Sequence, residues 1–363
     1  MVKRVCPICL RPSPSRDGEG GLAPAEPKRE KVWKASQGFH VRGNEHPACS
    51  LALYGSASPP KLAVGLGDIE RLAVETVNRR LALTGVQRKL SLSFAGRDTD
   101  RRLTIVGALG GSHILKPPAP EYPGMPELEH WTMVLARAAG LRTAEAGLIP
   151  LSSGQPAFIT KRFDREGSRR IHVEDLCQLS GLATEQKYRS SMEKVGTLVR
   201  NLATAPGDDA LRLLEVTLFS FVVGNSDMHL KNWTLVRDAG RVALSPAYDL
   251  LPVRLFVDDP EEFALPINGR KNRLKRRDFE ALAKHLKIPD IVTRRTIDDL
   301  PARLMRALER HPNPWVVPEQ AKAFNALVER NLAQLGHGRA VSRQLTSAPA
   351  TKRPTSRRAR PHR

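Results

Sequence analysis

The sequence predicts an α+β fold in two parts, a small β-sheet with one helix packed on it and a mainly helical part after it. Two observations support this prediction. Between residues 84 and 165, short strand-like segments alternate with Gly and Pro turns, and one helical segment interrupts them. After residue 170, most segments have apolar residues at helical spacing. The 363 residues are enough for one or two domains with a sizeable core.

The first part begins with a strand in which Leu90, Leu92 and Phe94 alternate with polar residues. Its helix has apolar residues at helical spacing around Trp131, and Gly140 is a typical C-terminal stop. The predicted order is a strand in TGVQRKLSLSF, a strand in GGSHILKPP, the helix in MPELEHWTMVLARAAGL, and strands in GLIPL and PAFITKRFD.

The second part is predicted to be helical except for one hairpin. The segment DDALRLLEVTLFSFVVG is apolar on almost all sides, which is typical of a buried core helix. The segment KNWTLVRDAGRVALSPAYDLLP predicts a hairpin that turns at Asp238, Ala239 and Gly240. Further helices along the chain are predicted in GLGDIERLAVETVNRRLAL, in HVEDLCQLSGL and near residues 278–287, 295–310 and 318–335.

The chain is strongly basic, with 58 Lys and Arg against 38 Asp and Glu and a formal charge of +20. The tail from Gly338 onward holds eight Lys and Arg and no acid, and its Arg, Pro and Ser content predicts disorder. Most of the excess positive charge therefore lies elsewhere. It suits either a polyanionic partner, such as nucleic acid or nucleotide phosphates, or a general solubility bias.

Several classes of protein are excluded by composition. No run of eighteen apolar residues predicts a membrane span, and MVKRVCPICL lacks the apolar region of a signal peptide. The four Cys residues are too few for a disulfide framework. We therefore expect a cytoplasmic protein with no membrane partner.

A group of polar residues follows the predicted buried helix. In VGNSDMHLKN, Asp227 and Asn232 lie five positions apart, and Asp249 follows after the hairpin. Phosphoryl transfer from ATP needs one carboxylate to orient and deprotonate the attacking hydroxyl. It also needs a carboxamide oxygen and a second carboxylate to hold Mg²⁺ against the phosphates. Protein kinases use the same Asp-to-Asn spacing, followed by a metal-binding Asp.

A cation for the phosphates is expected upstream of this group. Lys116 ends the apolar strand of HILKPP, and a helix Glu is the usual partner that orients such an ammonium group. Glu129 fits that role, with Glu127 as its competitor. Each residue alone has an ordinary explanation as a turn former or strand-end residue. Their order along the chain favours a bilobed kinase-like fold.

The N-terminal residues 1–55 have the spacing of a four-ligand zinc site, CxxC followed by HxxC. A metal ion there would supply the core of a segment too polar to fold alone. His40 is an alternative imidazole, and three unliganded thiols are the other interpretation. Cys177 lies on an apolar helical face and is expected to be an ordinary buried residue. The predicted zinc ligands are Cys6, Cys9, His46 and Cys49.

Many spaced segments of the chain agree with one known family. They are LTGVQRKLSLSF, HILKPP, ELEHWTMVLARAAGL, FITKRFDR, HVEDLCQLSGL with the KY that follows, VGNSDMHLKN and LSPAYDLLP. Over about residues 80–335 they resemble the HipA family, bacterial serine/threonine kinase toxins of type II toxin–antitoxin systems. The resemblance implies a bilobed kinase-like fold distantly similar to phosphatidylinositol 3/4-kinases. The expected parts are a Cys/His segment at 1–55, an N-lobe at 56–165, a C-lobe at 166–337 and a basic tail at 338–363.

The resemblance also implies roles for individual residues. Asp227 would be the catalytic base, with His229 in the same loop, and Lys116 would contact the ATP phosphates. Family members are inhibited by phosphorylation of a serine just before the GxQ turn, where this chain has Thr84. Either Thr84 substitutes for that serine, or the step is absent. The other implied nucleotide and Mg²⁺ residues are Gly85, Gln87 and Lys89 over the phosphates, Glu129 beside Lys116, Lys161 and Phe163 in the hinge at adenine, and Asn232 and Asp249 at Mg²⁺.

The resemblance finally implies substrates and partners. HipA substrates are typically aminoacyl-tRNA synthetases, and the partner is a helix-turn-helix antitoxin that represses the shared operon on DNA. The Cys/His segment stands where longer members have an extra N-terminal subdomain, which resembles a compact branch of the family. We expect a serine/threonine protein kinase that uses ATP, Mg²⁺ and a structural Zn²⁺. A nucleic-acid-associated co-repressor with a nucleotide-binding lobe and a small-molecule kinase remain open as alternatives.

Overall fold

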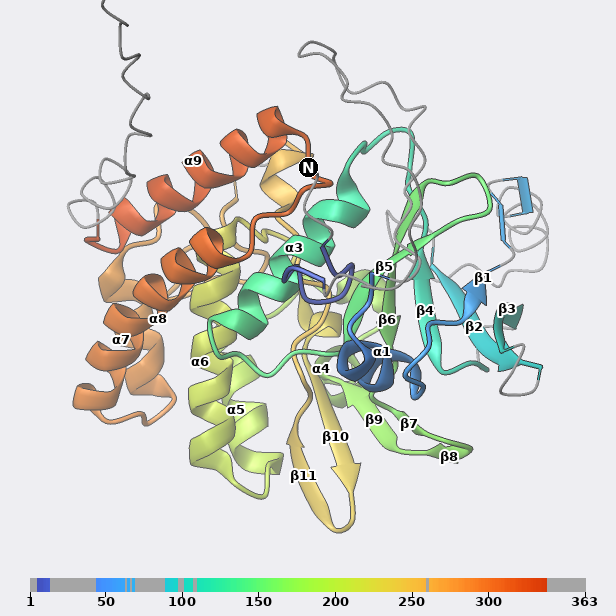
Figure 1. Ribbon diagram of the computed structural model, residues 1–363. Coiled ribbons are helices and arrows are strands. Elements are labelled where there is room, and N and C mark those ends of the chain that lie inside the picture. Colours follow the sequence, from blue (N-terminus) through green and yellow to red (C-terminus); the bar gives the residue numbers. More distant parts are fainter. Residues whose placement is uncertain are drawn as a thin grey trace, which may run out of the picture.

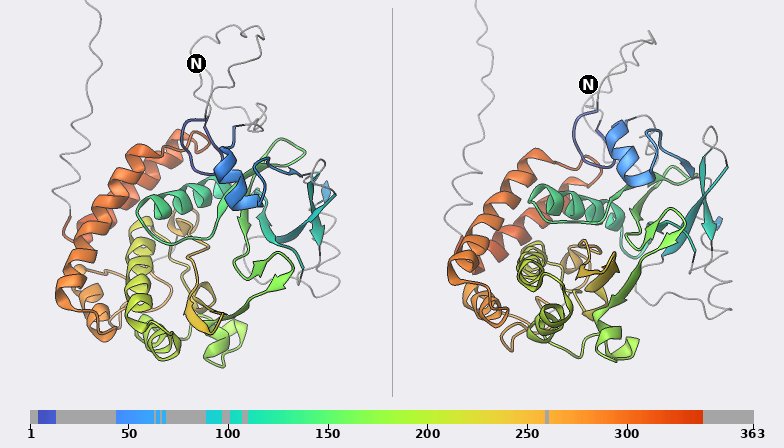
Figure 2. Two further views of the ribbon diagram at one scale, coloured as in Figure 1. Left: turned by 60° about the horizontal axis from the view of Figure 1, so that its bottom comes forward. Right: turned by 90° about the horizontal axis from the view of Figure 1, so that it is seen from below.

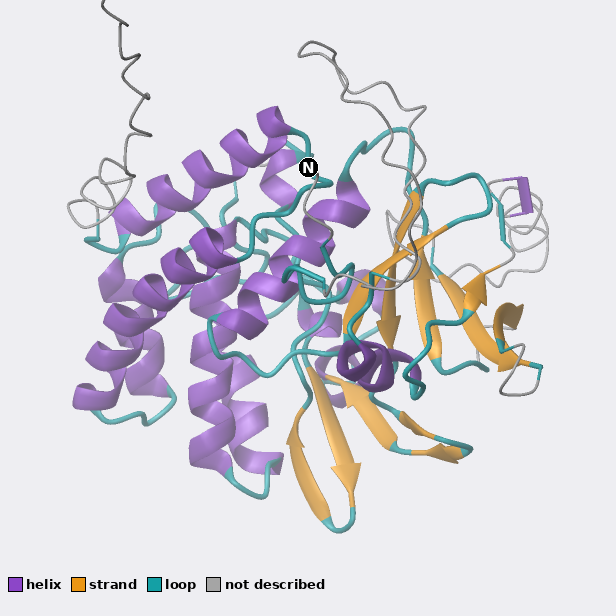
Figure 3. Ribbon diagram, in the orientation of Figure 1, coloured by secondary structure: helices purple, strands orange, loops and turns teal. Residues whose placement is uncertain are grey.

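The chain folds into two halves, a six-stranded sheet and a group of packed helices, with helix α3 between them (Figure 1). Figure 3 shows the same division by secondary structure. The structure is a computed structural model, and it describes residues 5–13, 44–62, 64–65, 67–68, 89–96, 101–106, 110–258 and 261–337.

The six-stranded sheet has the strand order β1-β3-β2-β4-β6-β5. All neighbouring pairs are antiparallel except β1 with β3. Strand β4 ends at Lys116 and lies between β2 and β6, so hydrogen bonds fix it from both sides. The strands are β1 (Lys61–Leu62), β2 (Leu90–Ala95), β3 (Arg102–Val106), β4 (His113–Lys116), β5 (Ala146–Pro150) and β6 (Pro156–Lys161).

Helix α3 (Met125–Ala138) joins the sheet to the helical half. Its apolar side chains share one core with Phe158 of β6 and with the C-terminal helices. The Trp131 ring lies 5.0 Å, centroid to centroid, from the ring of Phe324 in α9, and its Nε1 donates a 2.7 Å hydrogen bond to the His311 carbonyl. Burial of each large apolar side chain stabilises the fold by about 1.5–3 kcal/mol. The position of α3 is therefore set from both halves.

The helical half is arranged around α6, which is buried along most of its length, as its apolar sequence predicts. The ring of Phe221 packs 5.1 Å from that of Phe279 on α7. The helices are α5 (Met192–Leu202), α6 (Pro206–Val223), α7 (Arg276–His285), α8 (Asp290–Arg310) and α9 (Pro318–Gln334).

A second, three-stranded sheet has the order β11-β10-β9, and a small hairpin of β7 and β8 precedes it. The prediction that HVEDLCQLSGL is helical throughout is wrong. Its first residues form β9 because they pair with β10, with Asp175 opposite Thr234. The helix α4 begins only at Leu176, where the Asp175 carboxylate caps it by accepting from Gln178 N. The bounds are β7 (Arg165–Glu166), β8 (Arg169–Arg170), β9 (His172–Asp175), α4 (Leu176–Leu179), β10 (Thr234–Asp238) and β11 (Arg241–Leu244).

The helices and strands that were not predicted are β1, β3, β7, β8, α5 and α1 (Pro47–Tyr54). Helix α5 contains Gly196, which disfavours a helix by propensity. A Cβ atom at this position would lie 2.1 Å from Leu286 Cδ2, so the Gly permits close helix packing. The helix predicted in GLGDIERLAVETVNRRLAL falls almost entirely outside the described residues, as does the tail 338–363.

Within the described parts of the chain, no helix combines the length and the apolar composition needed to cross a membrane.

Gly224 ends α6 with φ of 76°, a left-handed conformation that favours glycine. A Cβ atom there would lie 2.5 Å from Cδ2 of the buried Leu327, whereas Gly240, also at φ of 76°, has open space. We expect Gly224→Ala to lower the free energy of unfolding by about 2–4 kcal/mol and Gly240→Ala by about 1 kcal/mol. Urea denaturation measures both. Equal losses would contradict the role of close packing at Gly224.

Candidate active site

A cluster of charged side chains, with Lys116 and Glu129 buried and Lys89 and Asp249 partly exposed, lies where β4, α3 and the segment after β11 meet. The Lys116 ammonium group contacts the Glu129 carboxylate and Asp249 Oδ1. Lys89 Nζ lies 3.2 Å from Asp249 Oδ2. It is Glu129, not Glu127, that meets Lys116, so the structure resolves that alternative. When Glu129 is ionised, two ammonium groups and two carboxylates leave this ion cluster without net charge.

Burial and charge act in opposite directions on these groups. Burial alone would lower the pKa of Lys116, but Asp249 and Glu129 hold it above its ordinary value. Burial would raise the pKa of Asp249, but Lys116 and Lys89 hold it well below its ordinary value. For Glu129 burial prevails over Lys116 and raises the pKa to about 7. Lys116 and Asp249 are therefore charged at neutral pH, and Glu129 is close to its titration point.

Asp249 is held in a strained backbone conformation. Its φ is 57°, in the left-handed region, which Asp tolerates better than most residues. Two residues earlier, Ala247 N donates to Arg142 O (2.8 Å), and Ala247 O accepts from Ala144 N (2.9 Å). These bonds tie the segment to the entry of β5. Strain of this kind persists only where the surroundings enforce it, and it is common at functional sites.

The loop after α6 brings Asp227 and Asn232 together. Asn232 Nδ2 donates a 2.8 Å hydrogen bond to the Asp227 carbonyl, so the carboxamide oxygen of Asn232 is the atom left for another partner. Asn225 connects this loop to the ion cluster. Its Nδ2 donates to the Asp249 carbonyl (3.1 Å), and its Oδ1 accepts from Asp227 N (3.4 Å).

The Asp227 carboxylate is accessible and has two side-chain neighbours. Its side chain is 43% exposed, and His229 Nε2 lies 3.9 Å from Oδ2. Burial lowers the pKa of His229, so its ring is neutral at pH 7. Oδ1 accepts a 2.6 Å hydrogen bond from the Tyr188 hydroxyl.

Asn225 and Tyr188 were not among the predicted site residues. Asn225 stands in VGNSDMHLKN, directly after the Gly that ends α6, and an Asn there is a recognisable turn former. No local pattern indicates that Tyr188 reaches Asp227, because the two are 39 positions apart.

The predicted adenine hinge follows β6. Lys161 N donates to Glu145 O (2.8 Å) and Arg162 N to Ser112 O (2.9 Å), so both groups are already paired. The Phe163 ring packs 5.5 Å from that of Tyr248. Adenine bound at this segment would therefore have to form its hydrogen bonds with other backbone groups.

The predicted phosphate residues Gly85 and Gln87, and Thr84, lie outside the described residues.

The four predicted zinc ligands lie together, with their ligand atoms all within 4.8 Å of one another. His46 Nδ1 is 3.3 Å from Cys9 Sγ and 3.9 Å from Cys49 Sγ. Tetrahedral zinc with bonds of about 2.0–2.3 Å separates its ligand atoms by similar distances. His46 Nε2 lies 2.9 Å from the Pro12 carbonyl, which favours the tautomer with Nδ1 free to bind a metal. The chemistry and spacing of this Cys/His cluster therefore fit zinc. His40, the alternative, lies outside the described residues.

The Cys/His segment packs on the main fold through buried groups. Cys6, Ile8 and Leu53 belong to one core with Leu115 of β4, whereas Leu10 belongs to the larger core of α3 and the helices. Figure 2 shows α1 close to the sheet. Three histidines bond to carbonyls of this segment, namely His113 to Leu53 (2.8 Å), His130 to Ile8 (3.2 Å) and His311 to Cys9 (3.2 Å).

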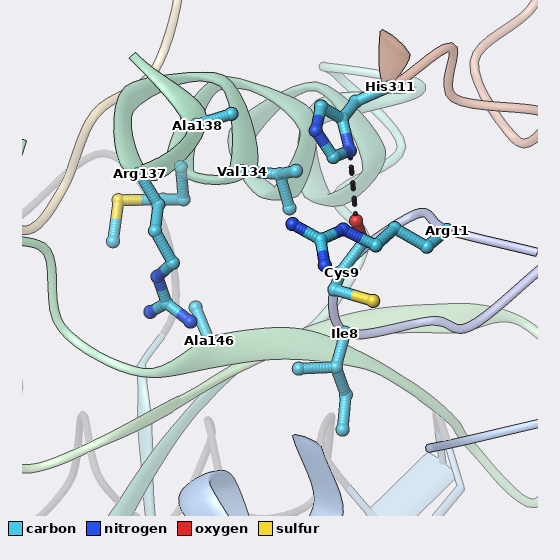
Figure 4. Close-up of a pocket in the computed structure, with 9 residues that line it drawn as sticks. Ile8, Cys9, Arg11, Val134, Arg137, Ala138, Ala146 and His311 are labelled. Atoms are coloured by element: carbon cyan, nitrogen blue, oxygen red, sulfur yellow. Dashed lines mark hydrogen bonds between the residues drawn. The ribbon is translucent and has the colours of Figure 1, made fainter. Parts of the chain in front are cut away.

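A cavity of about 120 Å³ lies between this segment, α3 and β5. Figure 4 shows Arg11 and His311 on one side of it and Arg137 on the other, with the bond from His311 to the Cys9 carbonyl. None of the predicted nucleotide residues lines it. The cavity therefore belongs to the interface of the Cys/His segment and is separate from the ion cluster.

Residues 81–308 match the family described as the HipA-like C-terminal domain. The chain belongs to this family. A Sinorhizobium fredii protein named "Putative kinase Y4mE" is 34% identical over 64% of this chain and 57% of its own length. The "Serine/threonine-protein kinase toxin HipA" of Shewanella oneidensis is 28% identical over 52% of this chain and 47% of its own length. The chain thus spans about half to three fifths of these relatives.

HipA in the Shewanella oneidensis complex of HipA, HipB and operator DNA superposes with a TM-score of 0.58 at 20% identity. The match covers 77% of this chain and 73% of that one. This likeness concerns the fold, and it confirms the predicted kinase-like α+β fold of the HipA family.

Replacement of Lys116 by Met would leave Glu129 buried without a counter-ion. Burial already raises the pKa of Glu129 from 4.5 to about 7, and loss of the ammonium group raises it further. A raised folded-state pKa means that stability is fully present below pH 4.5 and is lost as the pH rises through 7. We expect a loss of about 3–5 kcal/mol at pH 8 and a smaller loss at pH 5, measured by urea denaturation.

The control is the double variant Lys116→Met/Glu129→Gln, in which no buried carboxylate remains at position 129. Most of the difference between pH 5 and pH 8 should then disappear. The same loss at both pH values in the single variant would show that Glu129 is not the group responsible.

Proposed function

We propose that this chain is a HipA-family kinase that transfers the γ-phosphoryl group of ATP to a serine or threonine of a protein. The observation that supports it best is the ion cluster of Lys116, Glu129, Asp249 and Lys89. Asn225 links this cluster to the loop that carries Asp227 and Asn232. The residues that phosphoryl transfer requires therefore adjoin one another. The proposed lobes are residues 56–165 and 166–337.

Lys116 would supply positive charge to the ATP phosphates, with Glu129 holding the ammonium group in place. Asp249 and Asn232 offer the carboxylate and carboxamide oxygens that Mg²⁺ prefers. When bound, Mg²⁺ neutralises charge on the phosphates. Both Asp249 oxygens contact ammonium groups, and loss of one contact would leave that oxygen more open to the metal. Lys89 is the one free to move, because its side chain is 28% exposed and that of Lys116 is 5% exposed.

Lys89 would then turn from Asp249 to the phosphates. This fits the role proposed for the segment of Gly85, Gln87 and Lys89. Lys161 and Phe163 stay our proposal for the adenine hinge, and regulation at Thr84 is proposed on the family resemblance alone.

Asp227 would act as the base toward the acceptor. Its exposed carboxylate can be reached by a hydroxyl on another protein. The acceptor oxygen attacks the γ-phosphorus while its proton passes to Asp227, and the bond from γ-phosphorus to the bridging oxygen breaks to release ADP. His229, neutral and beside Asp227, would help to shape this loop.

Substrate and partners are proposed from the family. The matched Shewanella oneidensis structure contains HipA, HipB and operator DNA. We propose a helix-turn-helix antitoxin as the partner, DNA contact through that complex, a translation component such as an aminoacyl-tRNA synthetase as the substrate, and a cytoplasmic location. The chain's charge of +20 also favours a second candidate, a nucleic-acid-associated co-repressor with a nucleotide-binding lobe.

We also propose that Cys6, Cys9, His46 and Cys49 hold a structural Zn²⁺. The metal would neutralise the clustered thiolates and close the turn between the cysteines. The protein itself provides the remaining attachment through the buried histidines of β4, α3 and the segment after α8.

Transfer of ³²P from [γ-³²P]ATP with Mg²⁺ to the proteins of a bacterial lysate tests the kinase. We expect Asp227→Asn to reduce the transfer by at least about 100-fold, because the base is lost, while binding of a non-hydrolysable ATP analogue persists. Asp238→Asn, which changes an exposed Asp on the β10–β11 hairpin, is the matched control.

Full transfer by Asp227→Asn would refute the role of Asp227 as the base. If the native chain binds nucleic acid and transfers no phosphate, the co-repressor is favoured.

Zinc binding is tested by elemental analysis and thermal unfolding. We expect about one zinc per chain in the native protein, and we expect Cys49→Ser to lose most of it and to unfold at a lower temperature. Cys177→Ser is the control for zinc content, because this buried Cys does not belong to the cluster of four ligands. Equal zinc in the native chain and Cys49→Ser would overturn the ligand assignment.

A further inference from the structure

One oxygen of the Asp227 carboxylate accepts a hydrogen bond from a phenol hydroxyl of a separate segment. Tyr188 Oη donates a 2.6 Å hydrogen bond to Asp227 Oδ1. Tyr188 lies between the 3₁₀ turn η2 (Thr184–Gln186) and α5. The residue is 43% exposed, so burial does not force its hydroxyl to find a protein partner. The contact therefore needs another physical explanation.

Further contacts hold this segment against the Asp227 loop. Leu230 N donates to the Lys187 carbonyl (3.1 Å). The Tyr188 ring lies edge-on to the His229 ring, with centroids 5.3 Å apart and planes at 77°, an arrangement that aromatic pairs favour. The Lys187 ammonium group lies 5.0 Å from the centre of the Tyr188 ring. The hydroxyl is thus placed by its surroundings before an acceptor arrives.

We propose that Tyr188 is a positioning residue, which orients the Asp227 carboxylate to take the proton of the acceptor hydroxyl. This inference rests on the proposed function, in which Asp227 is the base. By holding Oδ1, the phenol fixes the plane of the carboxylate and leaves Oδ2 to receive the proton. His229 Nε2, at 3.9 Å, flanks Oδ2 without a hydrogen bond at that distance.

The groups whose charge acts on His229, the neighbour of Asp227, come from three segments. Asp227 lies in the same loop, Lys187 comes from the segment before α5, and Asp249 acts from beyond the hairpin. Removal of the Tyr188 hydroxyl frees the Asp227 carboxylate to rotate away from the orientation that receives the proton. A fall in kcat at an unchanged KM for ATP reports this effect.

The test compares Tyr188→Phe with Tyr248→Phe. Both remove one hydroxyl near the same loop, but Tyr248 Oη donates to the Lys231 carbonyl (2.7 Å) instead of Asp227. Initial rates of ³²P transfer from MgATP to acid-precipitable lysate protein are measured, and the rate without the added chain is subtracted. For Tyr188→Phe we expect kcat to fall about tenfold, since a hydrogen bond to a charged group is lost. The KM for ATP stays the same, because the hydroxyl acts on the base and not on the nucleotide.

Tyr248→Phe should lower the Tm without the tenfold fall in kcat. Transfer by the native chain with an unchanged kcat in Tyr188→Phe overturns the positioning role and leaves the proposed function standing. Phosphate found on Tyr188 by mass spectrometry also overturns it, because the phenol is then an acceptor. Absence of transfer by the native chain overturns the proposed function itself.

Discussion

The contact of Lys116 with Glu129 and Asp249 is the constraint on which the site depends. A buried ammonium group is tolerated only with partners that offset its lost hydration. Those partners come from α3 and from the segment after β11, while Lys116 itself ends a strand between two others. The sheet, α3 and the C-terminal half must all be in place before its charge is satisfied. The ion cluster therefore links the assembly of the fold to the assembly of the site.

The Cys/His segment adds a second link between the halves. Burial lowers the pKa of His113 and His130 to about 4, so both rings are neutral at pH 7 and can each offer an N–H to a carbonyl. They reach the segment from β4 and α3, the two elements that carry Lys116 and Glu129. A metal that stiffens the Cys/His turns would thereby also restrain the elements behind the ion cluster. Such a metal would thereby connect a segment remote in sequence to the proposed site.

Sequence patterns predicted features that depend on neighbouring residues, such as the ends of helices and strands, and features that depend on the chemistry of a motif, such as metal-ligand spacing. Lys116, Asp227 and Asn232 stand at strand ends and helix ends that periodicity and Gly or Pro punctuation reveal. Tyr188 and Asn225 were missed because their roles arise from contacts across the fold. Likewise β9 was assigned to a helix, since its register with β10 depends on a partner about sixty positions away. The spacing of two Cys/His pairs predicted a cluster even though 36 residues separate them, because metal ligands limit the possible arrangements.

The backbone at Asp249 is held in place by the chain itself. Its φ of 57° is enforced by bonds of Ala247 to Arg142 and Ala144 and by the bond of its own carbonyl to Asn225. The carboxylate is therefore aimed into the cluster by the chain itself, at some cost in strain. Lys89 offsets its charge from a half-exposed position. In the proposed function, Asp249 and Asn232 would hold a magnesium ion, which would supply positive charge as Lys89 does here. The bonds that fix the Asp249 backbone do not involve Lys89, so its replacement by the metal would leave them in place.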